Sequence, residues 1–173
     1  MMARLVVRAL FRSEWALKER CQRGGHGFAQ KLCHALHAYL QHENNSSIAW
    51  NSKFAGEPCF PHGMKSIFVS GAATLGRDCV IFQQVTIGSN TLADSKNLGA
   101  PTIGDRCYVG AGAKIIGNVR IGDDVRIGAN AVVSRDTVDN RFYSFRGRWM
   151  YFAGGGWSPV EDAAVLARLE GRA

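Results

Sequence analysis

The chain has 173 residues, with 21 lysines and arginines against 14 aspartates and glutamates, which gives a formal net charge of +7. This length suits one compact domain with small appendages and is sufficient to bury an apolar core. Hydrophobic residues make up 46% of the chain and charged residues 20%, a globular composition that excludes a wholly disordered protein. No apolar run approaches the roughly 18 residues that a membrane span needs, so we expect no stable membrane insertion.

Two stretches at the start of the chain predict helices. Apolar residues fall at helical spacing from Leu5 to Cys21 and from Phe28 to His42, and Gly24-Gly25 separates the two stretches. Residues 43–47 form a polar linker. The basic, apolar residues 1–11 are not followed by a small-residue cleavage site, so we expect no secretory signal. The five cysteines form no CxxC pair, and their odd number predicts reduced thiols and a cytoplasmic location.

A repeat of six residues follows the helical region. Glycine directly follows most of its aliphatic residues, and a small or β-branched residue comes four positions after them. This period is typical of a hexapeptide β-helix, whereas an amphipathic helix repeats every 3.6 residues and an ordinary strand every 2. The aliphatic ladder comprises Val69, Leu75, Ile81, Ile87 and, after a step of sixteen, Ile103, Val109, Ile115, Ile121, Ile127 and Val133.

The six-residue period predicts the shape of each coil. Three units close one coil, the aliphatic side chains point inward, and each stacks on the side chain eighteen residues later, as Val109 would on Ile127. We expect the small residues to pack near the corners and the glycines to relax the turn backbone. A weaker extension runs upstream through Ile48, Phe54 and Phe60.

The ladder is interrupted twice. Residues 88–102 must leave the coil as an extruded loop, which is either a functional loop on a rigid scaffold or a tolerated surface insertion. The step from Phe60 to Val69 is nine residues and contains Pro61-His62-Gly63. A lone histidine there can be structural or catalytic, and the spacing does not choose between the two.

An aromatic, basic and glycine-rich segment follows residue 139. Ser158-Pro159 then predicts the start of a short helix through Leu169, with serine as N-cap and proline in the first turn. The sequence therefore predicts a helical segment over 1–45, a β-helix over 46–139 that carries the extruded loop 88–102, and a C-terminal tail over 140–173.

Several motifs resemble the serine acetyltransferase group of hexapeptide-repeat acyltransferases. They are FPHGMKSIFVSGAATLG, QQVTIGS, APTIGD, YVGAGAKIIGNVRIGDD and IGANAVV, which together cover about residues 45–139. The loop length and the short helical N-terminus are more similar to members from capsule and exopolysaccharide loci, the colanic-acid type, than to the long enzymes of cysteine biosynthesis. The resemblance implies a left-handed parallel β-helix, a homotrimer, and acetyl-CoA bound in the cleft between neighbouring subunits.

The resemblance also implies roles for individual residues. His62 corresponds to the catalytic histidine and would act as general base on an acceptor hydroxyl, a task that suits a group titrating near neutrality. Backbone N–H groups near Gly88 and Ser89 would stabilise the oxyanion. Small side chains at Ala111 and Ala129 would let the pantetheine arm lie against the coil.

Two charged residues are candidates for the phosphates of CoA. Lys114 and Arg126 would meet these anionic groups, or would be solvated charges on the coil surface. Arg146 and Arg148 in the tail are weaker candidates. We expect no metal cofactor.

The sequence departs from the serine-specific members in ways that concern the acceptor. Ser47 stands where an aspartate orients the catalytic histidine, and Pro61 where another aspartate precedes it. Gly99-Ala100 stands where an Arg-His pair helps to hold serine, and a carboxylate is usually recognised by arginine. Glu57 or a residue of a neighbouring subunit could orient His62 instead.

These observations favour an acetyl-CoA-dependent O-acetyltransferase whose acceptor is a hydroxyl of a sugar or polysaccharide precursor or another small polar molecule. One alternative is a serine O-acetyltransferase of cysteine biosynthesis, and another is a non-catalytic β-helix scaffold trimer. No nucleic-acid-binding motif accompanies the charge of +7. A γ-type carbonic anhydrase would need three histidine ligands for zinc, and His62 is the only histidine within the coils.

Overall fold

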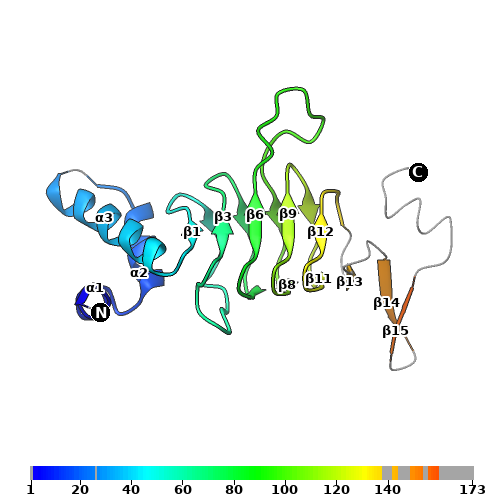
Figure 1. Ribbon diagram of the computed structural model, residues 1–173, viewed down its shortest axis with the longest axis horizontal. Helices are drawn as coiled ribbons and strands as arrows, with labels where there is room; N and C mark the ends of the chain where they lie inside the picture. The colour runs from blue at the N-terminus through cyan, green and yellow to red at the C-terminus, as the bar shows by residue number, and fades with distance from the viewer. Residues whose placement is uncertain (1, 26, 138–141, 144–148, 154–155, 160–173) are drawn as a thin grey trace.

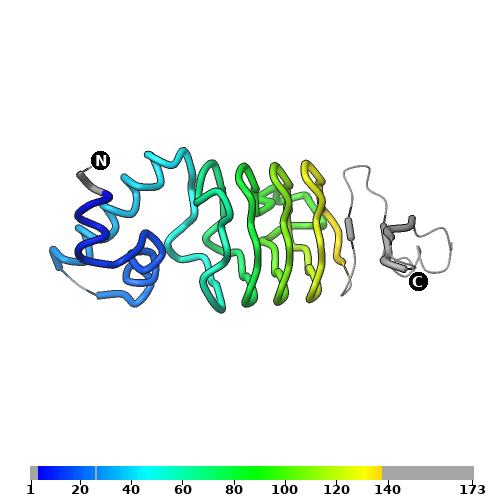
Figure 2. The backbone as a smooth tube through the Cα atoms, turned by 90° about the horizontal axis from the view of Figure 1, so that it is seen from below, coloured from blue at the N-terminus to red at the C-terminus, as the bar shows by residue number. Residues whose placement is uncertain are grey.

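The computed structural model describes residues 2–25, 27–137, 142–143, 149–153 and 156–159. A cluster of helices lies at one end, and coils of short strands continue from it along the long axis (Figure 1). Figure 2 shows the coils from a second side as successive turns of one stack. The helices are α1 (Met2–Phe11), α2 (Glu14–Gln22) and α3 (Phe28–Glu43).

The single helix expected from Leu5 to Cys21 is wrong, because the chain breaks between α1 and α2. Arg12 adopts a left-handed backbone conformation with φ 68°. Ser13 is extended, and its side chain accepts a hydrogen bond of 3.0 Å from the backbone N–H of Ala16. A serine cap of this kind favours a new helix start over continuation of the old helix. The α3 helix covers the second expected stretch.

The strands form three parallel sheets, one on each side of the coil. Sheet A contains β1, β3, β6, β9 and β12, sheet B contains β2, β4, β7 and β10, and sheet C contains β5, β8 and β11. This is the β-helix that the six-residue period predicts, in the left-handed parallel form that the family resemblance implies. The bounds are β1 (Ser47–Ile48), β2 (Lys53–Phe54), β3 (Phe68–Val69), β4 (Thr74–Leu75), β5 (Val80–Ile81), β6 (Thr86–Gly88), β7 (Thr102–Ile103), β8 (Tyr108–Val109), β9 (Lys114–Ile116), β10 (Arg120–Ile121), β11 (Arg126–Ile127) and β12 (Val132–Val133).

The aliphatic ladder forms the core, as the sequence predicts. All ten ladder residues are buried, and so are the small or β-branched residues four positions after them within the coils, whereas Thr91 on the extruded loop is exposed. Val109 pairs with Ile127 across sheet C, eighteen residues apart. Ile87 pairs with Ile115 at a separation of 28, because the extruded loop adds ten residues to that coil. Burial of this column of aliphatic side chains is the main favourable term that holds the coils together.

The expectation that the repeat glycines relax the turn backbone is wrong. The left-handed backbone positions lie three residues after the ladder positions, for example at Gln84 and Arg106, not at the glycines directly after them. At Gly76, Gly104 and Gly110, glycine is instead required by the close approach of the next coil. A Cβ on Gly76 would lie 2.5 Å from the carbonyl carbon of Gly104, and one on Gly104 would lie 2.8 Å from that of Gly122.

Polar contacts join the helices to the first coil. The Lys18 amine donates to the carbonyl of Ser52 at 2.9 Å, and Gln22 donates to the same oxygen at 2.6 Å. His37 lies 2.9 Å from the carbonyl oxygen of Ile48 through its Nε2. Burial lowers the pKa of His37 despite this contact, so the neutral ring donates the hydrogen bond.

Three further strands follow the coils. β13 (Phe142–Tyr143) extends sheet C in parallel, and β14 (Trp149–Ala153) and β15 (Gly156–Pro159) add to it in antiparallel fashion. Ser158 and Pro159 therefore belong to a strand rather than to the start of the expected helix. The rest of that helix, through Leu169, lies outside the described residues, as do Arg146 and Arg148.

Candidate functional site

The nine-residue step forms an enlarged corner between sheets C and A. Phe54 pairs with Leu75 at a separation of 21 rather than eighteen, so three extra residues lie in this first turn. His62 lies within the extra segment. We call this edge of the coil the His62 corner; it comprises residues 60–67, 82–85, 110–113 and 128–131, one segment from each successive coil.

The extra residues create a hollow on the coil surface. It has a volume of about 400 Å³ and is lined by His62, Lys65, Ser66, Gln83 and Gln84. His62 is exposed at this site. The hollow is open enough for a substrate to reach the imidazole.

Aromatic side chains support the His62 ring. It makes an edge contact with Phe82 at a centroid distance of 5.7 Å, and Phe82 in turn contacts Tyr108 at 5.1 Å. No described residue forms a hydrogen bond with the ring. Glu57, which the sequence offered as an orienting partner, makes no such bond, and neither does the Ser47 hydroxyl. The ring is held by packing alone within the described chain.

A second polar group of the hollow, the side chain of Gln83, lacks a hydrogen-bond donor for its oxygen. Among the described residues, the Oε1 of Gln83 is the only buried side-chain nitrogen or oxygen atom without a hydrogen-bond partner. A buried carbonyl oxygen without a donor is costly, and such atoms in native structures call for an explanation. A bound molecule with an N–H or O–H group could supply the donor. Sequence reasoning missed this acceptor, although Gln83 follows Ile81 by two residues as Ala111 follows Val109.

The two alanines expected to flank pantetheine lie below Gln83 on the same corner. Gly112 donates its backbone N–H to the carbonyl of Gln83 at 3.0 Å, and Asn130 donates to the carbonyl of Ala111 at 2.8 Å. These bonds place Gln83, Ala111 and Ala129 at equivalent positions of three successive coils. We call these three residues the corner column. Ala111 is half-buried and Ala129 is exposed.

The structure separates the two expected phosphate ligands. The Lys114 amine donates to the carbonyl of Gln84 at 2.7 Å, which holds this cation beside the hollow. Arg126 is exposed on sheet C next to Tyr108, without an ion pair to any described residue. Lys114 therefore adjoins the His62 corner directly, whereas Arg126 contributes a charge on the neighbouring face.

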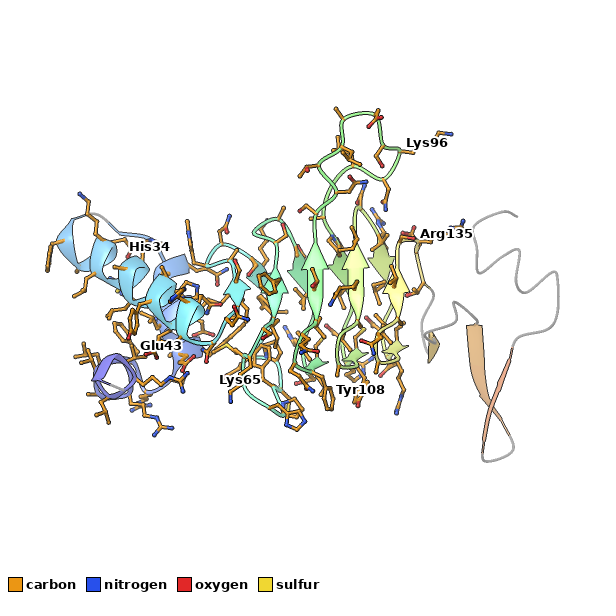
Figure 3. The ribbon with its side chains drawn as sticks, viewed as in Figure 1. His34, Glu43, Lys65, Lys96, Tyr108 and Arg135 are labelled. Atoms are coloured by element: carbon orange, nitrogen blue, oxygen red, sulfur yellow. The ribbon has the colours of Figure 1, made fainter. Side chains whose placement is uncertain are left out.

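Gly88 and Ser89, the expected oxyanion donors, do not lie at the His62 corner. They end strand β6 and begin the corner between sheets A and B, and the Ser89 hydroxyl lies 2.6 Å from the Ser70 hydroxyl. Figure 3 shows Lys65, at the His62 corner, and Lys96, on the extruded loop, at opposite edges of the coil. Within one chain, His62 and Gly88-Ser89 are therefore not neighbours.

The extruded loop leaves the coil at this second edge. Asn90 and Gly99 close its base through two backbone hydrogen bonds of 2.8 and 3.0 Å. The Asn97 amide donates to the carbonyls of Ile116 and Ser134, both at 3.3 Å, and so ties the loop to later coils. The loop also exposes the large apolar residues Leu92 and Leu98.

The other histidines of the described chain lie away from this site. His34, His37 and His42 are on α3, and His26 lies outside the described residues. Within the described ranges, no three histidine, cysteine, aspartate or glutamate side chains converge in a way that could hold a metal ion. Nor does any described helix have the length and hydropathy to cross a bilayer.

Comparison with known proteins gives a consistent family resemblance. Residues 100–135 match the family described as bacterial transferase hexapeptide (six repeats). The chain is 39% identical over 105 residues to a serine acetyltransferase from Synechococcus elongatus, a match that covers 60% of this chain and 42% of that protein. It is 45% identical over 67 residues to the serine acetyltransferase of Mycobacterium tuberculosis, covering 39% and 28%. The matches thus span less than half the length of these relatives.

Solved structures share the fold at lower identity. A serine acetyltransferase in complex with CoA has a TM-score of 0.64 at 22% identity, covering 85% of this chain and 55% of that one. The Neisseria gonorrhoeae serine acetyltransferase in complex with serine has a TM-score of 0.63 at 21% identity, covering 90% and 60%. The similarity extends from the coils into the N-terminal helices. At these identities the structural similarity shows a shared fold. The sequence matches indicate serine acetyltransferase-like relatives, and none of the proteins named here is of the capsule and exopolysaccharide type.

Proposed function

We propose that the protein is an acetyl-CoA-dependent O-acetyltransferase with His62 as its general base. The observation that carries the proposal is the His62 corner, where an exposed imidazole opens into a hollow at the head of the corner column. The match to the transferase hexapeptide family and to serine acetyltransferases supports the same chemistry. His62 would take the proton of the acceptor hydroxyl while that oxygen attacks the thioester carbonyl. The CoA thiolate would leave as the acetyl ester forms and would take up the proton.

The corner column would hold the pantetheine arm. Methyl side chains at Ala111 and Ala129 leave the backbone accessible. The Oε1 of Gln83 would accept a hydrogen bond from an amide N–H of the arm once its side chain turns toward the hollow. Lys114 lies beside this column, where its charge would attract the phosphates of CoA.

The oxyanion donors would come from a neighbouring copy of the chain. Gly88 and Ser89 lie on the opposite edge of sheet A from His62, so one chain alone does not bring the two groups together. In a homotrimer, the extruded loop edge of one copy would face the His62 corner of the next. The proposed site is therefore shared between copies, which is the arrangement that the family resemblance implies.

The comparisons favour L-serine as the acceptor. The relatives named above are serine acetyltransferases, and one of the solved structures is a complex with serine. They offer no support for the sugar acceptor that the sequence analysis placed first. We therefore put the alternative of a serine O-acetyltransferase ahead of the sugar acceptor.

One observation keeps a saccharide hydroxyl as a second candidate. Gly99-Ala100 carries no cation for the carboxylate of serine, and a Cβ on Gly99 would lie 3.0 Å from the Cβ of Asn118, so a larger side chain at position 99 would be crowded. Lys96 is the only cationic residue of residues 90–99. A neutral sugar hydroxyl would not need a cationic partner.

A panel of acceptors tests both candidates. L-serine, D-serine, monosaccharides and nucleotide sugars are incubated with acetyl-CoA, thiol release is followed, and each product is identified by mass spectrometry. Serine O-acetyltransferase activity predicts the highest kcat/KM for L-serine, with little for D-serine. Turnover of a sugar with none of L-serine would establish the second candidate. The His62→Ala protein is the control for spontaneous hydrolysis of the thioester.

Binding of CoA distinguishes an enzyme from a scaffold. We expect CoA to raise the melting temperature of the protein and Ala111→Trp to abolish binding by calorimetry, because a large ring would fill the corner column. If CoA neither raises the melting temperature nor binds by calorimetry, the protein would be a non-catalytic β-helix scaffold.

A further inference from the structure

The first helix presents an apolar face to solvent. Leu5, Val6 and Leu10 are 60%, 44% and 64% exposed, and Ala9 is exposed between them. We call these four residues the α1 face. At 100° per residue they lie within an arc of about 140° on one side of α1. Val7 lies outside this arc and is 1% exposed. Large apolar side chains gathered in this way usually mark a surface that is covered by a partner.

The edge of the α1 face is strongly basic. The α1 helix contains no acidic residue, and Arg8 and Arg12 are exposed without an ion pair to any described residue. Arg4 is engaged differently, because its guanidinium lies 2.7 Å from the side-chain oxygen of Asn44 and 3.3 Å from the carboxylate of Glu43. Two arginines are therefore available beside the apolar surface.

These arginines border a hollow between α1 and α2. The hollow has a volume of about 450 Å³, and Arg4, Leu5, Arg8, Arg12 and Glu14 are among its lining residues. Glu14 is occupied, since one of its carboxylate oxygens accepts from the Asn44 amide at 2.8 Å and the other lies 3.8 Å from the Arg4 guanidinium. The open side of the hollow is thus positively charged and adjoins the apolar surface.

We propose that α1 lies on an anionic membrane surface, with the α1 face in the headgroup boundary and Arg8 and Arg12 on lipid phosphates. A helix with apolar residues on one side and basic residues beside them is suited to this interfacial position, and long arginine side chains can reach the headgroups from its edge. The helix of ten residues lies on the bilayer and does not cross it. The inference concerns α1 and is independent of the proposed function.

Charge argues against a second copy as the occupant of this surface. Two copies that met through the α1 face in a symmetric contact would bring their arginines near one another. The α1 helix supplies no carboxylate to compensate, and the nearby Glu14 is already occupied. Anionic lipids supply the missing negative charge, and the formal net charge of +7 acts in the same direction.

The position of α1 in Figure 1 is compatible with a membrane contact. The helix lies in the helical end of the molecule, below α3 in this view and away from the last coil at β12. A membrane contact there would leave the faces of the coils free.

Sedimentation with vesicles tests the inference. The full chain is mixed with phosphatidylcholine vesicles, with and without phosphatidylglycerol, at several salt concentrations. We expect binding only to the anionic vesicles, with weakening as salt rises. The double variant Leu5→Gln/Leu10→Gln should lose binding by at least tenfold. Arg8→Gln/Arg12→Asn should lose about 25-fold, since each basic residue near such a surface contributes about fivefold.

Matched controls come from the last coil, at the far end of the β-helix from α1, and from the extruded loop. Leu92→Gln/Leu98→Gln removes two exposed apolar side chains, and Arg135→Gln removes an exposed cation; both proteins should bind like the parent. Circular dichroism melting checks that each variant is folded.

Two results would overturn the inference. One is equal binding of the parent protein to anionic and neutral vesicles, or unchanged binding to anionic vesicles when the α1 variants are folded. The other is a fall in molar mass on light scattering when the α1 face is altered, because a second copy would then be the occupant.

Discussion

His62 is the residue on which the proposed chemistry depends, and its exposed ring makes it testable without loss of the fold. We predict that His62→Ala lowers turnover by roughly 10²–10⁴-fold, the usual contribution of a general base. The melting temperature should be unchanged, because the ring lies on the surface and has no hydrogen bond to any described residue. His42→Ala, an exposed histidine of α3, is the matched control. Near-parental turnover in His62→Ala would remove the residue from the reaction.

Gln83 offers a second prediction, from its unpartnered oxygen. Gln83→Met removes a buried acceptor that has no donor in the described chain, so the melting temperature should stay constant or rise. If a pantetheine amide supplies the donor, KM for acetyl-CoA should rise about tenfold while KM for the acceptor changes little. Gln84→Met is the control, because that side chain is exposed. A destabilised variant with unchanged KM would assign Gln83 a structural role.

At the scale of elements, Lys18 shows how α2 is attached to the coils. Its side chain is 2% exposed, and its amine lies 5.0 Å from the ring centroid of Trp15 and 4.7 Å from that of Phe54. Burial disfavours the charged form and lowers the pKa of Lys18 from 10.5 to about 8. Between these pH values the unfolded chain binds more protons than the folded one, so the contribution of Lys18 to the free energy of unfolding rises with pH.

This gives a prediction for Lys18→Met. The difference in stability between the parent and the variant should shift in favour of the parent as pH rises from about 8 to 10.5. At pH 7 the variant should be at least as stable, since Gln22 still donates to the Ser52 carbonyl. The two proteins are compared by chemical denaturation at each pH, so that most of the contribution of other titrating groups cancels. Cys21 is one such group, because burial raises the pKa of its thiol to about 11. A difference that is independent of pH would contradict the prediction.

The extruded loop is a separate element with a separable role. Deleting residues 90–99 removes the ten added residues and leaves Ser89 joined to Ala100 across the closed base. We predict a folded β-helix with a similar melting temperature, because the ladder residues on both sides keep their partners in adjacent coils. Turnover should fall by at least a hundredfold if the loop edge of one copy completes the site of the next. Retained turnover would identify the loop as a tolerated surface insertion.

At the scale of the whole molecule, the separation of His62 from Gly88-Ser89 requires a second copy if both serve one reaction. We predict a trimer of about 57 kDa by light scattering, three times the 18.9 kDa chain. Mixing His62→Ala with the loop deletion should restore part of the activity, because some mixed trimers would pair an intact His62 corner with an intact loop. A monomer at micromolar concentration would rule out the shared site.

The sequence by itself determined the β-helix, since a six-residue aliphatic period has one structural solution that buries every repeat. It also located both interruptions, because insertions alter the spacing directly. It misjudged the repeat glycines and the helix break at Ser13. Contacts between coils determine where glycine is required. One capping hydrogen bond at Ser13 determines where the second helix begins.

Tertiary structure alone decided which candidate residues meet. Coil closure places His62, Gln83, Ala111 and Ala129 on one corner although up to 67 positions separate them, and it sends Gly88 and Ser89 to another. The unpartnered Oε1 of Gln83 and the exposed α1 face likewise depend on burial. Burial is a property of the folded chain because it depends on which distant segments pack together, and a local pattern of residue types does not specify it.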